Sequence, residues 1–180
     1  MTEAYIYDAV RSPRGKGRPD GSLHELTSVA LSAKVLNAIK ERNGLEGHVI
    51  EDVIWGNVTQ VGEQGGCLAR SAVLASDLDE RIPGLAINRF CASGLQSIAT
   101  AAERILTGGA DCIIAGGVES MSLVPMGGGK FSANPGLVGT WPESYASMGI
   151  TAELVAEKYA ISRADQDAFA AESHRRAAAA

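Results

Sequence analysis

The feature that most constrains the fold is one helical pattern held between two short apolar segments. The helix is predicted over about residues 92–106, because apolar side chains recur there at the i, i+3, i+4 and i+7 spacing of one helix face. Leu85–Asn88 and Cys112–Ala115 flank it and have the short apolar character of buried strands. This order predicts two parallel strands joined by a right-handed crossover. The apolar face of the helix consists of Leu95, Ile98, Ala99, Ala102, Ile105 and Leu106.

The same alternation extends toward the amino terminus. Ala4–Val10 is rich in β-forming residues and predicts a first strand, and a stripe of apolar residues predicts a helix over about Leu23–Arg42. We expect Gly44 to end that helix with a left-handed cap. A further strand is predicted over Val49–Val58 and a short helix over Cys67–Leu74. Alternating strands and helices indicate an α/β fold.

The pattern changes beyond the first two thirds of the chain. Met121–Pro142 is rich in Gly and Pro and has little periodicity, which predicts an excursion away from the first core. Two helices are predicted after it. One covers Thr151–Tyr159, and the other starts at Ser162, where Ser162 and Asp165 have the spacing of a capping box. Because the sequence stops inside this last helix on four alanines, we expect a truncated chain.

Composition and charge exclude several classes of function. The chain has 180 residues with a net charge of −5 and no stripe of Lys and Arg, so nucleic acid is not an expected partner. No apolar run approaches the roughly 20 residues needed to span a bilayer, and Met1–Ala9 lacks the character of a secretory signal. We therefore expect a cytoplasmic protein that does not enter a membrane.

The three cysteines, Cys67, Cys91 and Cys112, are spaced 24 and 21 residues apart, which matches no zinc or redox motif. No metal site is expected from them, and a reducing compartment would leave all three thiols free. Cys112 lies in an apolar segment and is expected in the core, whereas Cys67 is either packed or accessible.

Cys91 lies in the segment Asn88–Gln96, NRFCASGLQ, where a predicted strand ends and the long helix begins. This arrangement resembles the sharp strand-to-helix turns that present nucleophiles. Unpaired N–H groups and the positive end of the helix dipole lie at such a helix start and favour a thiolate, the reactive form of cysteine. The small residues that follow leave room for a substrate carbonyl. The alternative is a small buried hydrophobe, the usual role of a free cysteine.

Six stretches of the chain carry a resemblance to one enzyme family. They are DAVRSP (8–13), WGNV (55–58), NRFCASGL (88–95), AGGVESM (115–121), MGITAELVA (148–156) and ISRADQDAFA (161–170). With these stretches in order, the sequence resembles the thiolases over its whole length. The resemblance implies the thiolase-like α/β fold, in which two similar halves stack mixed sheets around shared buried helices. Residues 1–120 would form most of the first half with its covering helices, and residues 121–180 the beginning of the inserted loop domain that covers the substrate.

The resemblance also implies a reaction. Cys91 would attack the keto carbonyl of a 3-ketoacyl-CoA, the Cα–Cβ bond would break, and the acyl group would stay on the sulfur as a thioester until CoA removes it. The reverse direction condenses two acyl-CoA molecules. The backbone N–H of Cys91 would help to stabilise the oxyanion. CoA and acyl-CoA are then substrates, no separate cofactor is needed, and the assembly would be a homodimer or homotetramer.

Met148 opens the MGITAELVA stretch and is the expected substrate-binding residue. The resemblance implies that its soft thioether approaches the acyl and pantetheine part of the ligand. A core methionine is the alternative. Ser147 precedes it, where biosynthetic acetoacetyl-CoA thiolases often carry His, so acyl chain length and direction stay open.

The remaining catalytic groups of the family, an activating His, a second Cys and an Asn, lie in its carboxyl-terminal half. His24, His48 and His174 fall outside any thiolase motif. We therefore expect these 180 residues alone to be inactive, and we expect the helix after Cys91 to expose an apolar patch for lack of its covering half. Three alternatives stay open: a non-catalytic acyl-CoA-binding thiolase-like protein, an enzyme for sterol or other branched acyl-CoAs, and a redox-sensing thiol.

Overall fold

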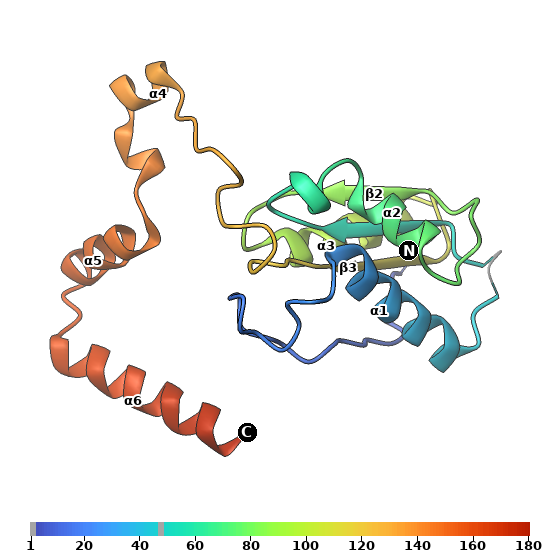
Figure 1. Ribbon diagram of the computed structural model, residues 1–180, viewed down its shortest axis with the longest axis horizontal. Coiled ribbons are helices and arrows are strands. Elements are labelled where there is room, and N and C mark those ends of the chain that lie inside the picture. Colours follow the sequence, from blue (N-terminus) through green and yellow to red (C-terminus); the bar gives the residue numbers. More distant parts are fainter. Residues whose placement is uncertain (1–2, 47–48) are drawn as a thin grey trace. The chain divides into compact units, whose positions relative to one another are not determined.

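The computed structural model describes residues 3–46 and 49–180 (Figure 1). The chain forms two compact units, one that extends to Phe131 and one from Ser132 to Ala180. The boundary predicted at residue 120 concerns the domains of the thiolase fold and stays a prediction.

The first unit is built on a three-stranded parallel sheet. Its strands are β1 (Asp52–Gly56), β2 (Gly84–Ile87) and β3 (Ile113–Gly117), in the order β2-β1-β3. Val53 is level with Gly84 of β2 and with Ile114 of β3, so the carboxyl ends of all three strands meet at one edge. The central strand β1 is buried along its whole length. These strands confirm the three predicted around Cys91, and all of them are parallel, so the described sheet has no antiparallel member.

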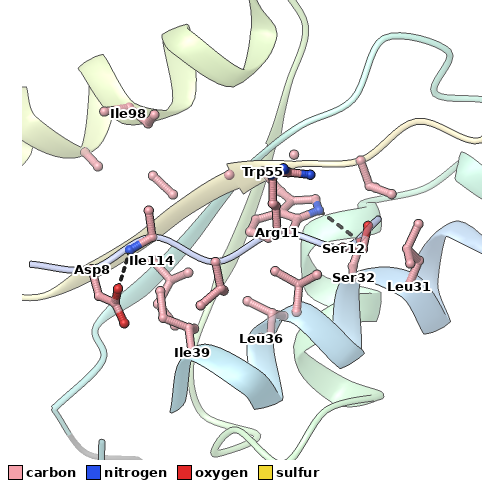
Figure 2. A pocket seen from close by; sticks show the side chains of 18 of the residues that line it. Asp8, Arg11, Ser12, Leu31, Ser32, Leu36, Ile39, Trp55, Ile98 and Ile114 are labelled. Carbon is pink, nitrogen blue, oxygen red and sulfur yellow. Dashed lines mark hydrogen bonds between the residues drawn. The ribbon is translucent and has the colours of Figure 1, made fainter. Parts of the chain in front are cut away.

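Helices cover both faces of this sheet. α1 (Ser28–Asn43) and α2 (Leu68–Leu74) contact each other and supply one side of the core, whereas α3 (Ser93–Leu106) packs on β1 and β3. In Figure 2, Leu36 and Ile39 of α1 lie on one side of the strand that carries Ile114, and Ile98 of α3 lies on the other. Arg104, near the end of α3, forms an ion pair with Asp52 at the start of β1. The sequence predicted α3 as the crossover helix between β2 and β3. This helix therefore also contacts the central strand β1.

The apolar core of this unit includes a hydrogen bond between a strand and a helix. Trp55 of β1 is almost fully buried, and its indole Nε1 donates a hydrogen bond of 3.0 Å to the hydroxyl of Ser32 on α1. A buried indole N–H needs such a partner. The other members of the core are Leu36, Ile50, Val53, Leu68, Ala69, Ala72, Val73, Leu78, Ile82 and Ile114.

The helix predicted near the amino terminus starts later than its apolar stripe indicated. α1 begins at Ser28, because the side chain of Thr27 accepts a hydrogen bond from the N–H of Ala30 and caps the helix there. Its predicted end is confirmed. Gly44 has a left-handed backbone with a φ of 59°, and the N–H groups of Gly44 and Leu45 bond to the last carbonyls of the helix.

Ala4–Val10, predicted as a strand, is not one in this structure. The segment has no regular secondary structure, and the side chains of Tyr5, Ile6 and Tyr7 are largely exposed. The segment pairs with none of the three described strands, and β-forming residues without a partner strand stay irregular. The segment instead borders a pocket of about 1130 Å³ against α1, β3 and α3 (Figure 2). Asp8 fastens it through a hydrogen bond from Asn43.

The second unit consists of three helices, each capped at its start by a side chain, and one 3₁₀ turn. They are α4 (Pro135–Thr140), the 3₁₀ turn η2 (Pro142–Tyr145), α5 (Met148–Lys158) and α6 (Arg163–Ala179), drawn in orange to red in Figure 1. Both predicted helices are confirmed. α5 begins a turn earlier than predicted, where Ser147 caps it, and Ser162 caps α6 as predicted. Asp165 differs from a full capping box, since its carboxylate bonds the hydroxyl of Ser162 at 2.6 Å.

Candidate active site

Cys91 lies in the turn that connects β2 to α3. β2 ends at Ile87 and α3 begins at Ser93, so the cysteine is two residues before the first helical residue. Its thiol is free and exposed. The alternative of a packed core cysteine therefore does not describe Cys91. Cys67 is also free and exposed, whereas Cys112 is only partly accessible.

The residue before the cysteine has a strained backbone. Phe90 has a φ of 47°, in the left-handed region that non-glycine residues rarely adopt. Two side chains hold it there. The Oδ1 of Asn88 accepts a hydrogen bond from the N–H of Phe90 at 2.8 Å, and the hydroxyl of Ser93 donates to its carbonyl at 2.6 Å. Conformations of this kind cost about 1–3 kcal/mol and persist where the surroundings over-determine them, which is common at functional sites.

The start of α3 approaches the end of β1 closely enough to require glycine. A Cβ on Gly56 would lie 2.7 Å from the backbone carbon of Ser93. Ser93 is buried, and its hydroxyl also accepts a hydrogen bond from the N–H of Arg89 at 2.8 Å. Two kinds of contact thus fix the turn that carries Cys91. One is the close approach of Ser93 to Gly56 of the central strand, and the other is the set of hydrogen bonds from the side chains of Asn88 and Ser93.

The face of α3 that meets the sheet is not the apolar stripe read from the sequence. Ser93, Ser97 and Ala101 are its buried residues, and the hydroxyl of Ser97 donates to the carbonyl of Gly116 in β3 at 2.8 Å. Leu95 on the opposite side is 72% exposed, and Ile98 and Leu106 are exposed as well. Small residues allow close contact with β1 and β3. Three residues of the apolar stripe, Leu95, Ile98 and Leu106, therefore form the exposed apolar patch that we expected for this helix, whereas Ala99, Ala102 and Ile105 are half-buried.

The start of α3, next to the Cys91 turn, has no side-chain cap. The N-cap position of α3 is Ala92, whose side chain makes no capping hydrogen bond, so the dipole of the helix is not offset by a cap there. Cys112 lies in a partly buried environment. Burial raises the pKa of the Cys112 thiol, and the nearby Glu51 carboxylate adds to the effect. Its thiol therefore stays protonated and unreactive at neutral pH.

Comparison with known proteins assigns this site to a family. The sequence model of a family described as "Thiolase, N-terminal domain" matches residues 4–180. The chain belongs to the thiolase family. The match takes in both units of this thiolase chain, including the Cys91 turn and the helices of the second unit.

Three named relatives of this thiolase chain come from bacteria. A 3-ketoacyl-CoA thiolase of Bacillus subtilis is 48% identical over 179 residues, which cover 99% of this chain and 45% of that protein. A 3-ketoacyl-CoA thiolase of Cronobacter sakazakii and the 3-ketoacyl-CoA thiolase FadA of Escherichia coli K12 are each 40% identical over 181 residues, covering 100% of this chain and 46% of their own lengths. The chain thus spans less than half the length of these relatives.

Met148, the second predicted site residue, is the first residue of α5 and is 72% exposed. It belongs to the second unit of the thiolase chain, whereas Cys91 belongs to the first. The structure therefore describes each residue separately, and their meeting around a ligand stays a prediction. The described residues hold no group of three or more His, Cys, Asp and Glu side chains suited to a metal ion. Over the same residues, no helix has the length and apolar character to cross a membrane.

A polar cluster beside the cysteine turn was missed by sequence reasoning. It lies where β1 and β3 end, and its members are Asn57, Gln64 and Glu119. Gln64, in the 3₁₀ turn η1 (Gly62–Gln64), is fully buried. Asn57 stands in the WGNV stretch and Glu119 in the AGGVESM stretch, so the family motifs were the one sequence feature that could have pointed to these residues. Nothing in composition or periodicity indicates that residues 57, 64 and 119 meet.

Proposed function

We propose that the protein that contains this chain is an acyl-CoA C-acyltransferase that works through an acyl-Cys91 thioester. The observation that carries the proposal is the free, exposed thiol of Cys91 on a strained strand-to-helix turn in a thiolase-family chain. Relatives named 3-ketoacyl-CoA thiolase support the substrate class.

The proposed reaction has two half-reactions. In the first, the Cys91 thiolate adds to the keto carbon of a 3-ketoacyl-CoA, and the bond from that carbon to the α carbon breaks. The bonding electrons and one proton leave with the α carbon as acetyl-CoA, and the shortened acyl group stays on the sulfur. In the second, the thiolate of free CoA attacks this thioester and releases the cysteine. The reverse sequence condenses two acyl-CoA molecules.

The described chain contributes the nucleophile and its surroundings to this scheme. The turn presents the sulfur, and the backbone N–H of Cys91 stabilises the oxyanion of the thioester-forming step. Acid–base groups are expected from residues outside this chain. Of its own histidines, His24 lies in the turns before α1 and His174 in α6, while His48 lies outside the described residues. We therefore propose that the 180 residues alone do not turn over.

The finer features of the proposal follow from the same family membership. CoA and acyl-CoA are the substrates and no cofactor is required. Met148 contacts the acyl and pantetheine part of the ligand, and its exposure leaves the thioether accessible for that contact. We further propose a homodimer or homotetramer in the cytoplasm that binds neither nucleic acid nor membrane.

Acylation of the complete polypeptide tests the proposal. After incubation with labelled acetyl-CoA and proteolysis, mass spectrometry is expected to find one acetyl group on the peptide that contains Cys91. Cys91→Ser should abolish both the label and CoA-dependent thiolysis. Cys67→Ser is the matched control, because Cys67 is equally free and exposed, and it should keep both. An unlabelled Cys91, or full turnover by Cys91→Ser, would overturn the assignment. Binding of acyl-CoA without label would favour the non-catalytic alternative.

A further inference from the structure

Glu119, the first polar residue after β3, gathers four N–H donors on its carboxylate. Three come from consecutive residues: the backbone N–H groups of Val58 (2.8 Å) and Thr59 (3.1 Å) and the side-chain amide of Asn57 (3.2 Å). The fourth is the side-chain amide of Gln64 at 2.8 Å. Only an ionised carboxylate offers two oxygens that accept and do not donate, so no other side chain of this length satisfies all four donors.

The cluster around Glu119 is anchored in the interior of the first unit. Gln64 is fully buried, and its Oε1 accepts hydrogen bonds from the hydroxyl of Ser28 and the N–H of Ser120, both at 2.7 Å. Its amide also donates to the carbonyl of Thr59 at 3.0 Å. The segment after β1 is thereby fixed between the start of α1 and the end of β3.

Val58 links the Glu119 cluster to the cysteine turn. Its N–H bonds Glu119, and its carbonyl accepts a hydrogen bond of 3.0 Å from the amide of Asn88. The other atom of the same amide, Oδ1, holds the N–H of Phe90 at 2.8 Å. A continuous series of hydrogen bonds therefore runs from Glu119 through Val58 and Asn88 to the left-handed residue before Cys91.

We propose that Glu119 is a positioning residue for the nucleophile: through Val58 and Asn88 it holds Phe90 in its left-handed conformation and so sets the direction of the Cys91 thiol. The inference rests on the proposed function for its meaning in catalysis, since it assigns Glu119 no contact with substrate. The geometric part stands on its own, because the rate at which an added reagent reaches the sulfur depends on the same turn.

The rate at which iodoacetamide alkylates Cys91 in the complete polypeptide reports on the conformation of that turn. Peptide mass spectrometry at fixed pH measures this rate. Glu119→Gln places an NH₂ group against N–H donors, and the expected change in the alkylation rate is about tenfold, the order of one hydrogen bond to a charged group. Asn88→Asp keeps the acceptor for Phe90 but loses the donor to Val58, and the same change is expected. If both act in one series, the double variant changes the rate by about tenfold and not about a hundredfold.

Two controls separate positioning from general loss of stability. Glu103→Gln makes the same charge change on the exposed side of α3, and Val73→Ala removes buried core volume in α2, which has no part in this series of hydrogen bonds. Both should alkylate at the parent rate. The proposal is overturned if Glu119→Gln alkylates at the parent rate, if the two effects multiply, or if Val73→Ala changes the rate as much. If Glu119→Gln does not fold, Asn88→Asp tests the proposal alone. An Asn88→Asp variant that alkylates at the parent rate would show that the hydrogen bond from Asn88 to Val58 does not affect the thiol, and this would overturn the proposal. Acetyl labelling of the unaltered protein reports separately on the proposed function.

Discussion

The two units of this chain reach ordered structure by different means. In the first, the side chains of β1 are buried from Asp52 to Gly56 and contact residues far away in sequence. In the second, α4, α5 and α6 have no buried residue, and each begins at an Asn or Ser whose side chain caps it. Long-range packing thus determines the unit that carries Cys91, whereas local hydrogen bonds determine the helices of the unit that carries Met148. Paired substitutions, one in each unit, test this contrast.

The two tryptophans give the largest expected difference. Trp55→Ala removes a buried ring and its bond to Ser32, and we expect the free energy of unfolding to fall by about 3–5 kcal/mol. Trp141→Ala, at a 63% exposed side chain of the second unit, should change it by less than about 0.5 kcal/mol. Urea denaturation followed by circular dichroism measures both. Equal losses would contradict the contrast.

Two glycines give the next largest effect. Gly56→Ala pushes a methyl group to within 2.7 Å of the Ser93 backbone, and overpacking of this kind costs about 1–3 kcal/mol. Gly139→Ala in α4 meets no atom within 4 Å, so stability should hold or rise by up to about 1 kcal/mol. The same denaturation measurement compares them. A neutral Gly56→Ala would mean that the helix start and β1 are less closely fixed than described.

The smallest effect concerns acid stability. The hydrogen bond from Asn43 lowers the pKa of Asp8, with help from the N–H of Ala9 and from Arg42. A depressed folded-state pKa gives stability that is present above the unfolded value and is lost as the pH falls through the folded one. Asp8→Asn should therefore make the loss of stability below about pH 4 shallower. Urea midpoints measured from neutral to acid pH check this.

A carboxylate of the second unit is the control for that titration. Hydrogen bonds from Arg175 and Arg176 lower the pKa of Glu172, but these partners are three and four residues away. They stay close in the unfolded chain, whereas the partners Asp8 and Asn43 are separated by 35 residues. Glu172→Gln should thus leave the acid slope unchanged. An equal change in both variants would remove the distinction between long-range and local contacts.

Much of the fold was predictable from the sequence because its signals are local. The left-handed cap at Gly44 and the cap at Ser162 were predicted and are confirmed. The position of Cys91 between a strand and a helix also followed from sequence alone. Each of these depends on a few neighbouring residues, whose backbone preferences and hydrogen-bonding groups are readable without knowledge of distant contacts.

The features that were wrong or missed depend on partners elsewhere in the chain. Ala4–Val10 has the composition of a strand, but it pairs with none of the three described strands. The apolar stripe of α3 predicted a helix correctly, yet its small residues Ser97 and Ala101 face the sheet. Glu119 is an ordinary acidic residue in the sequence, and only the meeting of β1 and β3 gives it four donors.

The pairing of β1 with β3 also bears on the order in which contacts can form while the chain is being synthesised. Asp52 is level with Ile113, so the central strand obtains its second neighbour only after some sixty further residues have been made and the α3 crossover has folded back. Glu119 follows that strand, and the tether from it to the cysteine turn cannot exist earlier. A nascent chain would therefore carry Cys91 on a turn without this tether until Glu119 has been made and β3 has paired with β1.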